Sequence, residues 1–578
     1  MFLILHGINL IDYYMKSKII ILAILFSLNI FAQSNLTNYL VGGSNDEYTY
    51  DHCFDSNGNF IIIGIVRGMD MFFTDTIGTP DNSNKNIFIR KYSSDLSTLI
   101  SSTVICGSGN DYCKSVDIDS QGNVFIAGHV YSSDPPTTPN AYQTTNNSPS
   151  SYEAYIVKLN PDLNQLLSAT YFGGEDKDYI YKMRIDQNDN IIAVGSTRST
   201  TNIATIGAYD ESYGGSDETI YHFGDAYIVK FDNNLENKLA ATYLGDEGDE
   251  ACFALSVNSD NNIVITGAST SSNYPVSANA FQTVKNASYD IVLTELNSDL
   301  TQVLHSTFVG GNGDDIAWDI AYNYTDQKYI IGVQTSSSFT ISGSVADATV
   351  NGGGDGMIII LNNDLENIHS ATYVGGSDVD FVSSVYYLNN AIYYCGITES
   401  ADLPTSSDAY YSNFLDENGY ADGFYGSIDT DLSEFEHLSY FGGNNDDLLW
   451  RVSSYNNKIY VNGNTMSSNI ESDSTLKGTS DAIFGVVENI YTNIGREDYN
   501  ILTGNSISIY PNPTTGVINI MGINNFEKLQ IFDLQGKLVK TYSSFTNQID
   551  INNLTSGNYT IKIISEDSVI TKKLVLID

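Results

Sequence analysis

The chain has 578 residues, which is too long for one ordinary compact core and indicates several domains or a repeat architecture. With 47 Gly, 41 Tyr and only 16% charged residues, the composition favours many short strands joined by tight turns, so we predict an all-β protein. The net charge is −43, and the 18 basic and 62 acidic residues between residues 34 and 499 account for all of it. Such a surface repels phosphate, which argues against nucleic acid or an anionic membrane as a partner.

Residues 1–33 are predicted to be a secretory signal peptide. From Met15 the chain shows two lysines, then an apolar run, then Ala32 and Gln33 at the expected cleavage site. Residues 1–14 fit no part of a signal peptide, so we expect Met15 to be the true start. The apolar run is shorter than a membrane-spanning helix usually is. No other segment approaches the required length of about 18 apolar residues, so we expect no transmembrane span.

One phrase recurs seven times between residues 34 and 490. Examples are "ATYFGGEDKD" from Ala169, "ATYVGGSDVD" from Ala371 and "LSYFGGNNDD" from Leu438, and consecutive copies are about 65 to 70 residues apart. Two other phrases keep step with it, a turn followed by an apolar strand that ends in Gly ("DSQGNVFIAG") and a second apolar strand ("DAYIVKFDNNL"). Each repeat therefore holds four strands, which predicts a β-propeller with seven four-stranded blades.

The ends of this region predict how the ring closes. The seventh repeat stops near residue 490 after three strands, whereas the region begins with an isolated strand, "NLTNYLVGG". Pairing this N-terminal strand with the last repeat completes the seventh blade and protects the edges that an open stack would expose.

The repeat phrases resemble the SBBP type of β-propeller repeat, a family found in secreted and surface proteins of bacteria and archaea. The resemblance rests on the GG turn, the hairpin turn, the "DAYIVKL"-like strand and loop phrases such as "PTTPNAYQTT" and "YPVSANAFQT". It covers about residues 36–490. It implies a fold and a location outside the cytoplasm, and it implies no reaction.

A polar linker is predicted at residues 491–505, and a second domain follows at 506–578. This tail alternates apolar and polar residues in about seven short segments, which predicts a small immunoglobulin-like β-sandwich. Pro511 and Pro513 keep a short segment out of ladder pairing, and Gly516, Gly536 and Gly557 permit turns.

The tail closely resembles the type A C-terminal sorting domain of the type IX (Por) secretion system of Bacteroidetes. The matching phrases are "YPNPTTG", "FDLQGKLV", "LTSGNYTIKI" and "KKLVL", in order and spacing. The resemblance implies that the domain is recognised by the type IX machinery and removed as the protein is released or attached to surface lipopolysaccharide. The motif residues are Pro511, Asn512, Pro513, Gly516, Asp533, Gly536, Gly557, Tyr559, Lys572 and Lys573.

No catalytic or cofactor motif stands out. His305, His369 and His437 share nearly one repeat phase, which indicates a structural position used three times. Acidic turns such as "GNGDD" could bind calcium, although Asp and Asn that cap tight turns are the expected explanation. Cys106 and Cys113 flank one turn and could form a disulfide, but we expect them to be two small buried hydrophobic residues.

Aromatic residues recur eight positions after the first residue of the GG pair, where Trp318 and Trp450 lie in the same phase as Tyr50, Tyr181 and Phe253. We expect them to pack between neighbouring blades; stacking on a sugar at the mouth of the propeller is the alternative. For a ligand site, we expect the loops between the second and third strands of each blade, because they vary most in length and content.

These observations favour a non-catalytic binding or adhesion module for an extracellular protein or glycan. We expect it to be a monomer and to be secreted through the periplasm to the medium or the outer-membrane surface. A hydrolase or lyase that acts on extracellular polysaccharide is the alternative. Carboxylates clustered at one mouth of the ring at glycosidase-like separations would favour the enzyme.

Deleting residues 506–578 is predicted to abolish delivery to the cell surface or medium, because the sorting signal is lost. Fractionation and immunoblotting of cells that express the full-length or truncated protein test this. Unchanged export of the truncated chain would contradict the sorting assignment.

Overall fold

The computed structural model describes residues 35–488, with gaps at 70, 80–82, 216–222, 340, 342–343, 416–420 and 457, and, within 508–576, seven strands together with residues 537, 551 and 554. The chain divides into two compact units, Met1–Thr492 and Asn493–Asp578, which are described separately. The signal peptide expected at 1–33 and the linker expected at 491–505 lie outside the described residues.

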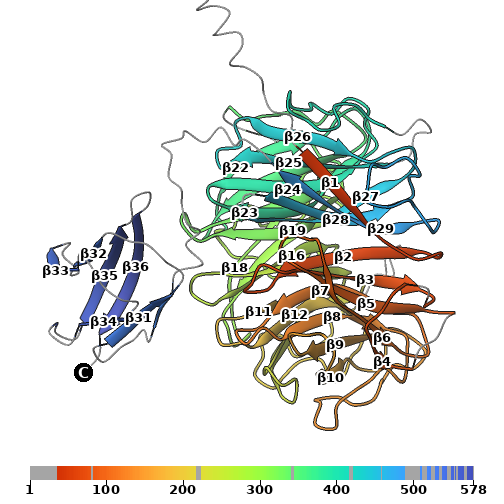
Figure 1. Cartoon of the computed structure of the whole chain (residues 1–578), viewed down its shortest axis with the longest axis horizontal. Helices are drawn as coiled ribbons and strands as arrows, with labels where there is room; N and C mark the ends of the chain where they lie inside the picture. Colours follow the sequence, from red (N-terminus) through yellow and green to blue (C-terminus); the bar gives the residue numbers. More distant parts are fainter. Residues whose placement is uncertain are drawn as a thin grey trace, which may run out of the picture. The chain divides into compact units, whose positions relative to one another are not determined.

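The first unit is built from seven antiparallel sheets, here called blades 1 to 7 (Figure 1). Blade 1 contains β2 (Glu47–Phe54), β3 (Phe60–Arg67), β5 (Lys85–Tyr92) and β6 (Leu99–Cys106), with the short β4 (Asp75–Gly78) parallel to β6. Blade 2 contains β7 (Asp111–Ile118), β8 (Val124–Val130), β9 (Glu153–Leu159) and β10 (Leu166–Phe172). Blade 3 contains β11 (Asp178–Ile185), β12 (Ile191–Thr197), β13 (Asp225–Phe231) and β14 (Lys238–Leu244).

Blade 4 contains β15 (Glu250–Val257), β16 (Ile263–Ser269), β17 (Asp290–Leu296) and β18 (Val303–Val309). Blade 5 contains β19 (Asp315–Asn323), β20 (Lys328–Thr335), β21 (Asp355–Asn362) and β22 (Ile368–Val374). Blade 6 contains β23 (Asp380–Leu388), β24 (Ala391–Thr398), β25 (Asp422–Asp429) and β26 (Phe435–Phe441). Blade 7 contains β27 (Asp447–Tyr455), β28 (Lys458–Thr465), β29 (Asp481–Glu488) and β1 (Asn35–Val41). The prediction of repeated four-stranded antiparallel units is confirmed.

The blades form a closed ring, as expected for a β-propeller. The first strand of each blade contacts the first strand of the next, and β27 of blade 7 contacts β2 of blade 1. The N-terminal β1 pairs antiparallel with β29, in a register that runs from Asn35 opposite Glu488 to Val41 opposite Ala482. Figure 1 shows β1, in red, beside the blue strands of blade 7. This pairing ties the two ends of the propeller region together and leaves no open blade edge there.

The hydrophobic core lies between neighbouring blades. Strands such as β8 and β9 are buried along their whole length because a sheet covers each of their faces. One cluster joins Phe125 and Phe172 of blade 2 to Tyr227 and Phe231 of blade 3, and similar clusters connect other blades. The apolar runs in the repeat are therefore blade-to-blade contacts.

A leucine in the turn between the third and fourth strands adds a second link between blades. Leu235 and Leu300 adopt the left-handed conformation, with φ of 58° and 56°, and are fully buried. The backbone penalty of about 1–2 kcal/mol is offset by burial of the side chain, worth about 1.5–3 kcal/mol. The backbone N–H of Tyr142 in blade 2 donates to the carbonyl of Leu235 in blade 3 (2.9 Å), and Tyr209 does the same for Leu300 (2.8 Å). The recurrent loop phrases thus dock one blade onto the next.

The GG turn lies where carboxylates of two blades meet. A methyl group added at Gly442 would collide with the carboxylates of Asp422 in blade 6 and Asp447 in blade 7. The N–H of Gly443 donates to Asp447 (2.7 Å), and equivalent bonds recur in other blades. The acidic residue of the phrase therefore caps its own turn, as expected. Within the described ranges no three His, Cys, Asp or Glu side chains come together as a metal site, and calcium binding stays a prediction.

The cysteines settle one alternative. Cys106 and Cys113 form no disulfide and are buried, which confirms the expectation of two small hydrophobic residues. Both are buried in apolar clusters on either side of the turn, where they act as small hydrophobic residues.

The C-terminal unit contains two antiparallel sheets. One consists of β30 (Ser508–Tyr510), β31 (Val517–Met521) and β34 (Gln548–Asp550); the other of β33 (Leu538–Tyr542), β32 (Lys528–Phe532), β35 (Gly557–Ile564) and β36 (Val569–Leu576). Leu529, Ile531, Ile549 and Ile561 are buried. An immunoglobulin-like arrangement of these sheets stays a prediction.

The motif residues of this unit are only partly described. Gly557 begins β35, Tyr559 is buried in the same strand, and Lys572 and Lys573 lie in β36. Pro511, Asn512, Pro513, Gly516, Asp533 and Gly536 lie outside the described residues.

The buried carboxylates between blades make the stability of the propeller pH-dependent. Burial raises the pKa of Asp178 to about 7 and that of Glu153 to about 8, and six other acidic residues that begin strands are raised to between about 6 and about 8. Between about pH 4 and these values the folded state binds more protons than the unfolded chain, so stability falls as pH rises. Burial lowers the pKa of His52 to about 4 and that of His129 to about 3, which opposes this trend up to about pH 6.5, but the carboxylates are more numerous.

We therefore predict that the midpoint of thermal unfolding is roughly 5 °C or more higher at about pH 5 than at about pH 7.5, measured by calorimetry of the full-length protein. In an Asp178→Asn variant the unfolding midpoint should depend less on pH, because one titrating group is removed. A midpoint that is constant or rises over this interval would show that these carboxylates are ionised in the fold.

Candidate ligand pocket on the propeller axis

Each innermost strand contains one extra residue, a β-bulge, at the same place in every blade. In β11, Ile180 pairs with Gly195 and Lys182 with Val194, so Tyr181 has no partner of its own. The extra residues of the seven blades are Tyr50, Lys114, Tyr181, Phe253, Trp318, Ser383 and Trp450. Bulges re-aim side chains relative to a regular strand.

The bulge explains a glycine near the end of the second strand in six of the seven blades. In these blades the residue that pairs just before the bulge is opposite Gly, for example Gly195 and Gly463. In blade 5 it is opposite Val333. A methyl group at Gly195 would collide with the carbonyl oxygen of Tyr179, and one at Gly463 with that of Leu448. Only glycine allows the bulged backbone to approach this closely.

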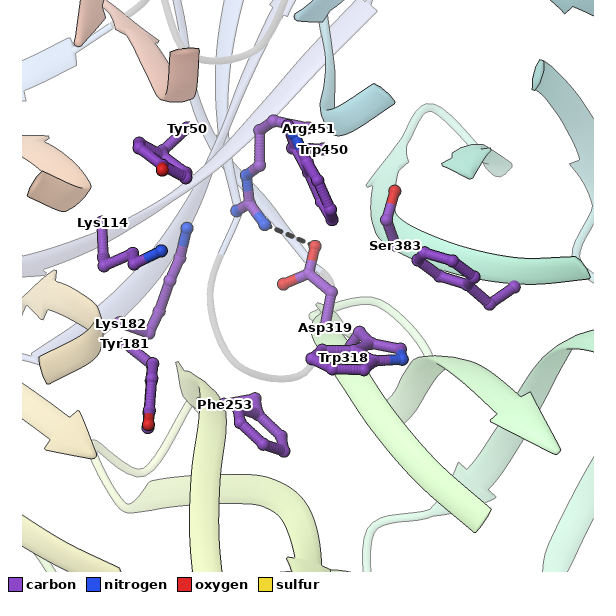
Figure 2. A pocket seen from close by; sticks show the side chains of 11 residues that line it. Tyr50, Lys114, Tyr181, Lys182, Phe253, Trp318, Asp319, Ser383, Trp450 and Arg451 are labelled. Atoms are coloured by element: carbon purple, nitrogen blue, oxygen red, sulfur yellow. Dashed lines mark hydrogen bonds and ion pairs between the residues drawn. The ribbon is translucent and has the colours of Figure 1, made fainter. Parts of the chain in front are cut away.

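All seven extra residues line one pocket of about 380 Å³, here called the axial pocket because every innermost strand contributes to it (Figure 2). Its remaining lining residues are Lys182, Asp319, Phe381 and Arg451. Lys182, Asp319 and Arg451 each directly follow an extra residue. In a regular strand consecutive side chains point to opposite faces, so the bulge is what allows both to face the axis.

One wall of the axial pocket is aromatic. The ring centroids of Tyr181 and Phe253 are 5.2 Å apart, those of Phe253 and Trp318 are 4.9 Å apart, and those of Trp318 and Phe381 are 6.1 Å apart. These rings come from blades 3 to 6. Trp450 of blade 7 is oriented by its indole N–H, which donates to the side-chain oxygen of Asn464 (3.0 Å). The wall is partly exposed, so its rings are available to a ligand.

A network of charges runs across the axis beside the aromatic wall. Arg451 contacts Asp319 at 2.5 Å through Nη1 and Asp51 at 3.1 Å through Nε, and Lys182 Nζ lies 2.9 Å from Asp51. Ser115 donates to Asp51 (3.1 Å) and Ser384 to Asp319 (2.7 Å). The network therefore joins blades 1, 2, 3, 5, 6 and 7, and Figure 2 shows the Arg451 to Asp319 bond inside the pocket.

The charged groups of this network determine one another's protonation states. Burial would raise the pKa values of Asp51 and Asp319, but the nearby Lys182 and Arg451 hold the pKa of Asp51 well below its ordinary range and also lower that of Asp319. Burial and the neighbouring guanidinium of Arg451 lower the pKa of Lys182 to about 7. Both carboxylates are thus ionised at neutral pH and engaged by cations.

Lys114 is the remaining charged residue of the lining. Its Nζ lies 4.0 Å from the centroid of the Tyr50 ring, and burial lowers the pKa of its ammonium to about 8. Figure 2 shows Lys114 and Tyr50 on the side of the pocket across from Trp318.

The pocket adds to one expectation from the sequence. Tyr50, Tyr181, Phe253, Trp318 and Trp450 line the axial pocket, and the rings of Tyr181, Phe253 and Trp318 also contact one another between neighbouring blades, as we expected. The described residues of the loops between second and third strands are not part of the pocket lining, and a ligand site in those loops stays a prediction.

The sequence contained a signal for the lining residues that were missed. Lys114 and Ser383 also lie eight positions after the first position of the GG pair, which is Cys106 in blade 2 and Gly375 in blade 6, so the phase alone could have identified them. Lys182, Asp319 and Arg451 follow at the next position, but their role depends on the bulges, which the phase does not reveal. His305, His369 and His437 lie on β18, β22 and β26, the outermost strands, away from the pocket.

Comparison with known proteins identifies the C-terminal unit. Residues 508–577 match the family of secretion system C-terminal sorting domains. This domain directs the protein to the cell surface or the extracellular space. The described part of the chain contains no helix with the length and apolar character that a membrane crossing requires. No curated protein matches the chain.

Three solved structures that resemble the chain are distant from it in sequence. The WD40 β-propeller domain of Doa1 is 11% identical, with a TM-score of 0.38, over 79% of this chain and 97% of that chain. A PL25 ulvan lyase bound to -[GlcA(1-4)Rha3S]- is 9% identical, with a TM-score of 0.40, over 78% and 94%. Quinohemoprotein alcohol dehydrogenase from Comamonas testosteroni is 8% identical, with a TM-score of 0.39, over 79% and 76%. At this distance they carry no information about function.

The charge network should be essential to the propeller. Replacing Asp51 by Asn leaves Lys182 without its carboxylate in a buried site, and the expected cost is about 3–5 kcal/mol of unfolding free energy. Denaturant unfolding of the full-length protein measures it. Asp260→Asn, at an exposed turn position, is the matched control and should be nearly neutral. Equal stability of the two variants would mean that the network does not stabilise the ring.

Proposed function

We propose that the protein is a secreted or cell-surface propeller that binds a glycan in the axial pocket. The observation that carries this proposal is the arc of aromatic rings from neighbouring blades, partly exposed and beside fixed polar groups. A sugar ring presents a face of C–H groups and a rim of hydroxyls. Aromatic faces can pack against the C–H groups, and the charged and hydroxyl side chains of the pocket can form hydrogen bonds with the hydroxyl groups.

The size of the pocket supports a glycan over a folded protein partner. About 380 Å³ lies in the range of small-ligand sites, whereas a stable protein interface needs a broad surface. A few sugar units of a longer chain could enter a pocket of this size. Adhesion would then result from recognition of one glycan segment at the axis.

An enzyme acting on polysaccharide is the alternative. Hydrolysis by two carboxylates needs one of them protonated as a general acid. Asp319 and Asp51 do not suit this role, because Arg451 contacts both and their pKa values are lowered. Lys114, with a pKa of about 8, is a better candidate for a base, which would favour a lyase.

For export, we propose that residues 506–578 are read by the type IX secretion machinery. The match of residues 508–577 to secretion system sorting domains supports this. The motif residues named from the sequence are proposed to carry recognition, with Tyr559 acting through the core of the domain, because it is buried. The SBBP character of the repeats and an origin in Bacteroidetes belong to the same proposal.

A glycan array probed with the full-length protein tests the binding function. We expect retention of at least one oligosaccharide class, and about 10-fold weaker binding by Trp318→Ala, because one stacking platform is lost. Phe281→Ala is the matched control: Phe281 is an exposed aromatic residue in the loop between the second and third strands of blade 4.

Two results would contradict the proposal. Loss of binding in Phe281→Ala with retention in Trp318→Ala would place the site in the loops. Mass spectrometry that finds shortened or unsaturated products after incubation would establish an enzyme in place of a binding module.

A further inference from the structure

Lys114, which is half-buried, differs from the buried lysines of the propeller. Lys91, Lys158, Lys182 and Lys230 each have Nζ within 3.3 Å of a carboxylate oxygen. Among the ion pairs and hydrogen bonds found within residues 35–488, none involves the ammonium group of Lys114; its contact is with the face of Tyr50. Removing an ammonium group even partly from water without a carboxylate beside it costs free energy, which points to a partner supplied from outside the chain.

The charge balance of the axial pocket points the same way. Lys182 and Arg451 are matched by Asp51 and Asp319, which leaves Lys114 as a surplus positive charge. The protein as a whole carries a formal charge of −43. A positive centre inside such an acidic molecule favours an anionic group at the axis and disfavours it elsewhere on the surface.

Lys114 lies across the axial pocket from the aromatic wall (Figure 2). Lys114 is the extra residue of the bulge in blade 2, and Trp318 is the extra residue of the bulge in blade 5. Figure 2 shows them on opposite sides of the same pocket. A ring stacked on the wall could therefore direct a substituent toward the ammonium group.

We propose that the axial pocket is selective for acidic saccharides, with Lys114 binding the carboxylate of a uronate or the sulfate ester of a sulfated sugar while the sugar ring stacks on the aromatic wall. This inference rests on the proposed glycan-binding function and adds the class of glycan. Charged hydrogen bonds of this kind contribute enough to decide between acidic and neutral sugars.

The test compares matched acidic and neutral ligands by titration calorimetry with the full-length protein. The probes are an oligogalacturonate, its fully methyl-esterified form, a sulfated galactan oligosaccharide and its desulfated form. We expect binding of one acidic member, and at least about 10-fold weaker binding of its neutral counterpart. The two acidic probes distinguish a uronate site from a sulfate site.

Three variants connect the preference to Lys114. Lys114→Met should lose the preference for the acidic ligand by about 10- to 100-fold, and Lys114→Arg should retain most of it because the charge remains. Lys85→Met is the matched control, since Lys85 also lies over a tyrosine ring but is not part of the pocket lining. Unfolding midpoints close to that of the parent protein establish that each variant is folded.

The outcomes separate the inference from the function on which it rests. Binding of neutral and acidic probes with equal affinity, or an unchanged preference in Lys114→Met, would overturn the inference and leave glycan binding intact. Failure to bind any of these probes or any member of a broad glycan array would overturn the glycan-binding function, and the inference with it.

Discussion

The bulge in each innermost strand is the constraint on which the rest of the propeller depends. It places two consecutive side chains toward the axis, where a regular strand would provide one. The first of each pair lines the axial pocket. The second, in Asp51, Lys182, Asp319 and Arg451, forms the charge network that joins the blades across the axis. Binding surface and structural closure thus arise from the same backbone feature.

The bulge also determines what the neighbouring strand can be. In six of the blades a glycine is needed opposite the residue before the bulge, because the displaced backbone approaches it closely. Away from the axis, the blades are held by apolar clusters, by the buried turn leucines and by capped GG turns. These contacts use almost every recurrent phrase of the sequence, so the recurrent phrases are mainly structural. The residues that differ among the blades at the bulge position, such as Trp318, Lys114 and Ser383, are those that face the pocket.

The distribution of charge separates the pocket from the outer surface. The exterior is acidic, which suits an exported protein that must remain soluble and avoid phosphate-bearing surfaces. Inside the pocket, cations and carboxylates nearly balance, with Lys114 in surplus. An anion that meets the outer surface is repelled, whereas one attached to a sugar stacked at the axis would find a positive partner. Overall charge therefore indicates little about the polarity of an enclosed site.

By itself, the sequence determined the repeat, the four strands of each blade, the closing role of the N-terminal strand and the sorting domain. These features follow from local periodicity, turn chemistry and recurrent phrases. Such patterns extend over a few residues, so they can be recognised without knowledge of tertiary contacts. Only the tertiary structure decided where the aromatic residues lie. A repeat phase shows that Tyr50 and Trp318 are equivalent, but not whether they face a neighbouring blade or the axis. That depends on a one-residue bulge, which shifts the facing of every side chain around it and is set by pairing between strands. Likewise, Asp51 and Arg451 are 400 residues apart in sequence, and only closure of the ring brings their charges together.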